Sequence, residues 1–271
     1  MLHSTNPMID THAHFDHFIS DNTVADVILR AKQAGVQKII TCSTCPEDWS
    51  VYAKLAKDFP EVKWQAGIHP TEIKDTDDLA LDALASLFIP TSDTPTPVAI
   101  GEIGLDFYWL PKDPAEVEKV KARQLEIFMR QLNIASDLNT KVCVHARNAV
   151  REAIDAIEKS NLPFSNVVFH CFSGTKDEII ELNERGARAS FTGIITYKNA
   201  EEMRQAMRTQ PLELLMFETD CPYLAPVPHR GKKCEPSMLP ITIETASQIL
   251  EKPVGYIKDL STQNATTFFD C

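Results

Sequence analysis

The chain alternates short apolar runs with longer amphipathic segments, eight times over. The short runs are rich in β-branched residues and lack in/out alternation, which is typical of parallel strands covered on both faces. Eight strands are predicted, at residues 8–10, 36–42, 63–68, 98–103, 141–144, 167–169, 187–191 and 214–217. The segments between them have apolar residues at helical spacing, and two of these segments end at glycines that suit a helix C-terminus, Gly35 and Gly186.

Repeated strand–helix alternation predicts an α/β fold, a single-domain (β/α)8 TIM barrel. The length of 271 residues suits one such barrel. The structural alternative is an open doubly wound sheet, which is disfavoured because no glycine-rich dinucleotide loop follows the first strand. We expect residues 1–7 to be a short N-terminal extension and residues 8–271 to form the barrel domain.

Composition excludes several classes of protein. With 44% hydrophobic and 24% charged residues, the chain is neither disordered nor fibrous. The formal charge of −11 argues against bulk electrostatic capture of nucleic acid, although a local site stays open. Seven scattered cysteines do not form a disulfide framework, and neither a secretory signal nor a membrane span is recognisable. We therefore expect a cytoplasmic protein that does not bind membranes.

Reactive side chains gather where the predicted strands end. In a TIM barrel, catalytic groups come from the C-terminal ends of the strands. Six of the eight predicted strands deliver a histidine or carboxylate there, namely His12 and His14, His69, Glu102, His145, His170, and Asp220 in the segment 218–220. Each one alone has a structural explanation, such as a surface loop, a hydrogen-bonded histidine or a buried ion pair.

Taken together, these side chains predict a metal site. Imidazoles and carboxylates are the ligands of divalent transition metals, and the candidate ligands are His12, His14, Glu102, His145, His170 and Asp220. Six ligands are more than one tetrahedral ion uses. Two divalent ions bridged by a carboxylate account for the number and suit in-line displacement at phosphorus. The identity of the metal stays open among Mg, Mn and Zn.

Eight short motifs lie in a defined order along nearly the whole chain. They are IDTHAHFDH (9–17), AGIHP (66–70), GEIGLDFY (101–108), VHAR (144–147), HCFSG (170–174), ETDCPYLAP (218–226), RGKKCEP (230–236) and NATTFF (264–269). In this order they resemble the TatD-type metal-dependent hydrolases of the amidohydrolase-like superfamily. Two positions depart from the family pattern, Cys234 in place of Asn and Ser173 in place of Thr. Neither is a candidate ligand, so the departures bear on substrate preference.

The resemblance implies a two-metal phosphodiesterase, described for the family as a deoxyribonuclease with 3′→5′ exonuclease action on DNA. RNA ends are a further candidate substrate. Carried over by motif, one metal is held by His12, His14 and Asp220 and the other by His145 and His170, with Glu102 bridging both. Asp220 would also orient or deprotonate the attacking water, so Asp220 and Glu102 are the candidate catalytic residues.

Four further residues are candidates for substrate binding. Arg147 can hold a phosphate in a bidentate contact, or else form a surface ion pair. His69 can hydrogen-bond a phosphate oxygen or a metal ligand, or else be structural. Tyr223 and Arg230 follow the last strand and either meet the nucleic-acid backbone or belong to a solvated loop. The aromatic run at 107–109 can stack on a base or simply cover the barrel end.

Two other functions remain as alternatives to the nuclease. One is a two-metal hydrolase of another ester, for example an acyl ester on tRNA. The other is a metal-bound module without catalysis, whose expected signature, loss of a ligand, is not seen. The oligomeric state is left open.

Overall fold

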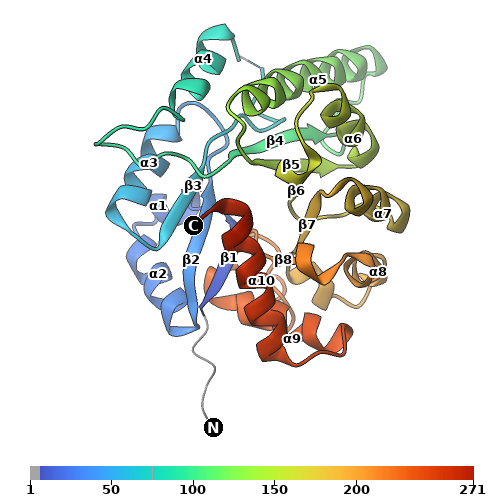
Figure 1. The fold of residues 1–271 in the computed structure, drawn as a ribbon. Helices are drawn as coiled ribbons and strands as arrows, with labels where there is room; N and C mark the ends of the chain where they lie inside the picture. The colour runs from blue at the N-terminus through green and yellow to red at the C-terminus, as the bar shows by residue number, and fades with distance from the viewer. Residues whose placement is uncertain (1–6, 75) are drawn as a thin grey trace.

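In the part of the chain that the structure describes, eight parallel strands form the centre of the molecule (Figure 1). The computed structural model describes residues 7–74 and 76–271, so most of the expected extension at residues 1–7 lies outside the described residues. The strands are β1 Met8–Ala13, β2 Val36–Cys42, β3 Val62–Gln65, β4 Ile100–Asp106, β5 Val142–Arg147, β6 Val167–Phe169, β7 Arg188–Phe191 and β8 Met216–Phe217. The predicted strands at 36–42 and 167–169 agree with the structure to the residue.

The strands pair in chain order, in two arcs. β1 to β3 form a three-stranded arc, and β4 to β8 form a five-stranded arc. A single parallel bridge from Ala66 to Ile100 joins β3 to β4, and another from Ala13 to Cys221 joins β1 to the segment after β8. These two seams close the ring. The predicted (β/α)8 barrel is therefore confirmed, and the open sheet is excluded.

Helices surround the strands (Figure 1). They are α1 Asp16–Ser20, α2 Val24–Gln33, α3 Trp49–Asp58, α4 Asp78–Ser86, α5 Pro114–Asp137, α6 Val150–Lys159, α7 Lys176–Arg185, α8 Glu201–Thr209, α9 Leu239–Ile249 and α10 Val254–Phe269. Their ends follow local chemistry: Thr175 and Glu178 form a capping box at α7, and Gly186 ends it at φ 88°. Among the described helices, none combines the length and apolar character needed to cross a membrane.

The amino end of the barrel is filled by apolar side chains. Strand residues pack there against the last turns of α10, which lies across the strands in Figure 1. The cluster consists of Ile9, Ile40, Ala99, Cys143, Val168, Met216, Ala265, Phe268 and Phe269. Because side chains two residues apart share a strand face, Cys143 and Val168 place His145 and His170 inside the barrel at its opposite, carboxyl end.

Several elements differ from their predicted bounds. β4 and β5 run on to Asp106 and Arg147, so His145 lies within its strand rather than after it. β8 is only two residues long, because the first predicted strand residue, Leu214, ends the 3-10 turn Leu212–Leu214 and the strand begins at Met216. The five-residue helix α1 was not predicted, because it is too short to show helical periodicity.

Candidate metal centre

The Glu102 carboxylate lies at the centre of a histidine cluster. Glu102 is 2% exposed and comes from the middle of β4. The five histidines come from β1, from β5 and from the segments after β1, β3 and β6. Its Oε1 lies 2.6 Å from Nδ1 of His145, 2.7 Å from Nε2 of His170 and 3.4 Å from Nε2 of His69. Its Oε2 lies 3.3 Å and 3.4 Å from the Nε2 atoms of His12 and His14.

Asp220 lies on the Oε2 side of this cluster. Its Oδ1 is 3.4 Å from Nε2 of His14 and 3.9 Å from Nε2 of His12. The backbone of Asp220 has a φ of 54°, which is uncommon for a residue other than glycine, and its N–H donates to the carbonyl of His12 at 3.0 Å. The donors thus lie on both oxygens of Glu102, and His170, on the Oε1 side, also lies within 4.8 Å of donor atoms of His12 and Asp220.

This division parallels the assignment that the family resemblance implies. His12, His14 and Asp220 lie on one side, and His145 and His170 on the other. The structure places His69, which was expected to contact substrate, on the second side as close to Glu102 as His14 is. His69 is therefore a further candidate ligand.

The pKa values of the cluster reflect its charges. Burial alone would raise the pKa of Glu102, but the charge of His170 and hydrogen bonds from His12 and His145 hold it well below its usual range. Burial opposes protonation of His14, yet the hydrogen bond to Asp220 and the charge of Glu102 raise its pKa to about 9. The charge of Glu102 likewise outweighs burial and raises the pKa of His170.

The donor set fits divalent metal ions. Three groups of three donor atoms lie within 4.8 Å of one another: His12–His14–Glu102, His12–His170–Asp220 and His69–Glu102–His145. Nε2 of His12 lies 3.2 Å from Nε2 of His14, and Nδ1 of His145 lies 3.2 Å from Nε2 of His170. Two such nitrogens so close together must share a proton or point to one cation. Buried imidazoles converging on carboxylates suit metals of the zinc and manganese type.

A second layer of carboxylates supports the donors. Oδ2 of Asp106 lies 3.1 Å from Nε2 of His145, and Oε1 of Glu218 lies 3.5 Å from Nδ1 of His170. Asp10 accepts hydrogen bonds from the Thr219 N–H at 2.9 Å and hydroxyl at 2.6 Å, which ties β1 to the segment bearing Asp220. Such partners orient ligand histidines. Sequence reasoning assigned no role to Asp106, although it follows Glu102 by four residues in one strand.

The candidate substrate-binding residues lie around the barrel mouth. Arg147 is exposed at the end of β5, and its guanidinium stacks on the Tyr108 ring at 3.9 Å. Among the described residues, no carboxylate pairs with it. The ring of Tyr223, 54% exposed, lies 6.2 Å from that of His14. Arg230 lies on the Tyr197 ring at 4.4 Å, and its described contacts do not bring it to the donor cluster.

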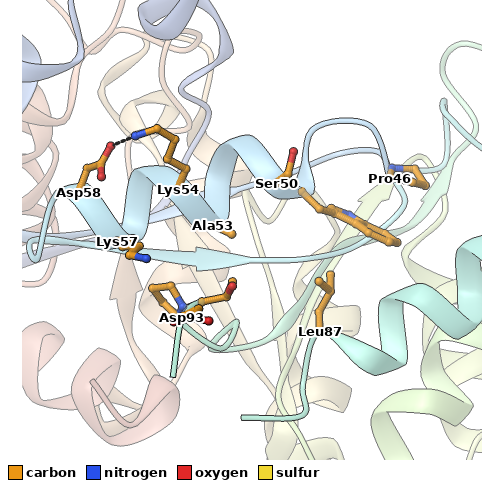
Figure 2. Close-up of a pocket in the computed structure, with 11 residues that line it drawn as sticks. Pro46, Ser50, Ala53, Lys54, Lys57, Asp58, Leu87 and Asp93 are labelled. Atoms are coloured by element: carbon orange, nitrogen blue, oxygen red, sulfur yellow. Dashed lines mark hydrogen bonds and ion pairs between the residues drawn. The ribbon is translucent and has the colours of Figure 1, made fainter. Parts of the chain in front are cut away.

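One hollow of the described residues lies elsewhere. It has a volume of about 730 Å³ and lies between α3 and the segment 93–95, on the outside of the barrel. Figure 2 shows Lys54, Lys57 and Asp93 on its walls, and no donor of the cluster is among its lining residues. A second hollow borders the mouth and is described below.

Comparisons with known proteins identify the chain's relatives. Residues 9–270 match the family model described as "TatD related DNase". A protein of Escherichia coli K12 described as the uncharacterized metal-dependent hydrolase YcfH is 31% identical over 266 residues, covering 97% of this chain and 95% of its own. A protein of Bacillus subtilis described as the uncharacterized metal-dependent hydrolase YabD is 29% identical over 262 residues, covering 97% of this chain and 98% of its own.

Solved structures agree with this grouping. The crystal structure of YJJV, a TatD homolog from Escherichia coli K12, superposes with a TM-score of 0.87 at 28% identity, covering 97% of this chain and 98% of that one. The family match spans nearly the whole barrel, including every candidate donor. The chain belongs to the TatD-related DNase family.

Proposed function

We propose that this protein is a metal-dependent phosphodiesterase that removes nucleotides from DNA ends, in the 3′→5′ direction. The observation that carries the proposal is the division of the donors around Glu102: histidines and Asp220 on Oε2, and histidines alone on Oε1. Two divalent ions held by these side chains would suit in-line displacement at phosphorus. Family membership supports a nucleic acid as the substrate.

The chain's own residues divide the work of the reaction. When bound, two divalent ions would neutralise the phosphodiester and lower the pKa of the attacking water. The hydrogen bond and the charge of His14 outweigh burial and lower the pKa of the Asp220 carboxyl, so that it is ionised. The ionised carboxylate accepts the water proton at Oδ1. His145 is held in orientation by Asp106, so its nitrogen facing Glu102 stays aligned.

Side chains at the rim of the barrel mouth would orient the substrate. Arg147 presents a planar guanidinium that the Tyr108 ring holds in place, and it can contact two phosphate oxygens at once. Tyr223 lies on the opposite side of the mouth, beside His14. A strand end entering between them would place its terminal phosphodiester over Glu102.

Asp220→Asn tests the mechanism. The amide cannot accept the proton, so we expect hydrolysis of single-stranded DNA to fall about 10²- to 10⁴-fold while the circular dichroism spectrum is unchanged. Asp16→Asn is the matched control, because Asp16 is an exposed carboxylate near the same mouth, 3.6 Å from His17. Labels at the 5′ and the 3′ end separate the two directions. Full activity of Asp220→Asn would overturn the mechanism, and a metal-loaded protein inert on every phosphodiester would overturn the function.

A reducing compartment such as the cytoplasm also suits the structure. All seven cysteines are free thiols, and burial raises the pKa of several of them, including Cys42 and Cys143. Secreted proteins more often pair their cysteines.

A further inference from the structure

A pocket of about 580 Å³ borders the candidate metal centre. It lies between the segment after β3 and the segment between β4 and α5, and its floor is the first half of α5. Its walls include Pro70, Lys74, Trp109, Pro111, Arg123 and Gln124. The volume falls within the range of about 300–1,000 Å³ that is typical of small-molecule sites. The metal chemistry described above does not use it.

Two hydrogen-bonded connections join this pocket to the donor cluster. On one wall, Thr71 Oγ1 lies 2.7 Å from Nδ1 of His69, whose other nitrogen faces Glu102. On the other wall, Oδ1 of Asp106 accepts from the Trp109 N–H at 3.1 Å, while Oδ2 lies 3.1 Å from His145. One wall of the pocket therefore contacts His69 directly, and the other contacts His145 through Asp106. The pocket thus lies next to the donor cluster at the same end of the barrel.

Trp109 gives the pocket an aromatic wall. Its side chain is 67% exposed, which is unusual for tryptophan, and its ring meets that of Tyr108 edge-on at 4.9 Å. Tyr108 in turn carries Arg147 on its face. The side chains of Arg147, Tyr108 and Trp109 thus contact one another in this order, from the end of β5 to the wall of the pocket.

Cations line the other side. Lys74, Lys119 and Arg123 all face the pocket. Lys119 pairs with Glu116 at 2.7 Å and Arg123 with Glu126 at 2.9 Å, but these pairs are exposed and weakly held. An aromatic wall together with cations is the combination that recognises a base and its phosphate.

We propose that this pocket binds the nucleotide next to the scissile phosphate, with its base stacked on Trp109. The inference rests on the proposed function and adds the place where the neighbouring base lies. Proline rings at Pro70 and Pro111 offer flat apolar surface on the walls, which suits the faces of a planar base. The adjacent backbone phosphate lies toward Arg147.

The pocket holds any of the four bases. Two of its polar side chains are already bonded within the protein: Gln124 bonds the backbone N–H and carbonyl of Asp106 at 2.9 Å and 3.0 Å, and Arg123 donates to the carbonyl of Thr76. Few groups are left to read the edge of a base. Stacking does not discriminate strongly among bases, so one site serves an enzyme that shortens strands of any sequence.

Binding of phosphorothioate-linked pentathymidylate to the Mn²⁺-loaded protein tests the inference. Trp109 is exposed, whereas Trp49 and Trp64, the other two of the three tryptophans, are buried. We therefore expect the oligonucleotide to quench tryptophan fluorescence, and Trp109→Ala to remove the quenching and raise Kd about tenfold. Trp109→Phe keeps a stacking face and should stay within about threefold of the original Kd. Tyr256→Ala is the matched control, because Tyr256 is 48% exposed on α10, at the opposite end of the barrel.

An abasic series gives the decisive comparison. Removing one base at a time from the pentamer should weaken binding most at one position, and at that position Trp109→Ala should add little further loss, since both changes delete the same contact. Equal losses at all positions, or an unchanged Kd for Trp109→Ala, would overturn the inference. Quenching by inorganic triphosphate alone would assign the pocket to an anion without a base. Because these measurements report binding, they stand apart from any failure of hydrolysis.

Discussion

Metal affinity of the centre should depend steeply on pH, because a ligand histidine must be neutral. In the metal-free protein, the hydrogen bond to Asp220 and the charge of Glu102 outweigh burial and raise the pKa of His14 to about 9. Below that pH, an ion that takes His14 as a ligand must displace its proton. The pKa values of His145 and His170 are raised as well, so ions that take these histidines as ligands should also compete with protons.

The size of the effect follows from the pKa of His14. Two pH units separate pH 7 from its pKa of about 9, and each costs about 1.4 kcal/mol of binding free energy. The association constant for Mn²⁺ should therefore rise about tenfold for each pH unit from 7 to 9, or about 100-fold over the interval. Above pH 9 the contribution of His14 should level off.

Calorimetric titration of the chelator-stripped protein measures both quantities. Titrations in two buffers of different ionisation enthalpy give the number of protons released, and a pH series gives the slope. His14→Ala should reduce the proton release, whereas His17→Ala should not, because the exposed His17 pairs with Asp16 and lies outside the cluster. Affinity that is constant from pH 7 to 9, with no proton release, would refute the placement of His14 among the ligands.

Three further predictions concern stability. Gly104→Ala should lower the free energy of unfolding by about 3 kcal/mol or more, because Gly104 has a φ of 147° and an added Cβ would lie 1.9 Å from the His145 carbonyl oxygen; an unchanged melting temperature would contradict this. Gln131→Ala should lower the free energy of unfolding, measured in urea, by about 2–3 kcal/mol, because the Gln131 amide bonds the buried Ile68 N–H and carbonyl at 2.8 Å and 3.1 Å. Gln205→Ala, at an exposed position, is the control. The free energy of unfolding of the metal-free protein should fall by about 3 kcal/mol as the pH rises from 6.5 to 9. The raised pKa of His14 stabilises the fold fully below pH 6.5, and this stabilisation is lost as the pH rises through about 9. Denaturation midpoints that rise with pH would speak against it.

The sequence predicted the barrel and the cluster for one shared reason. Strand ends in a parallel barrel meet at one face, so reactive residues that follow apolar runs must come together. Glu102 was recognisable because a carboxylate in an apolar strand needs a cationic partner, and the structure provides five histidines around it.

Other features depend on geometry that spacing does not reveal. Asp106 was missed because the predicted strand ended at residue 103, whereas β4 runs on to Asp106. His69 lies four residues beyond the end of β3, so its approach to Glu102 depends on a turn rather than on strand period. The contact of Arg147 with Tyr108 joins β5 to the loop after β4, and no pattern within either segment indicates it.

The two seams of the barrel pass beside the candidate metal centre. At one seam, the His14 N–H donates to the carbonyl of Cys221 at 2.7 Å, and the Asp220 N–H to that of His12. At the other, the Gly101 N–H donates to the carbonyl of Ala66 at 3.0 Å. Few backbone hydrogen bonds cross either seam, so the cohesion of the two arcs depends also on other contacts between them.

An ion on the Oε2 side would take His12 and His14 from the three-stranded arc and Glu102 and Asp220 from the five-stranded arc. It would therefore act as a removable crosslink between the first strand of the chain and the segment after the last one. Its binding free energy would add to the cohesion of the closed ring, and separating the arcs would require releasing the ion. In such a barrel the metal centre that carries out the reaction would also hold the two arcs of strands together.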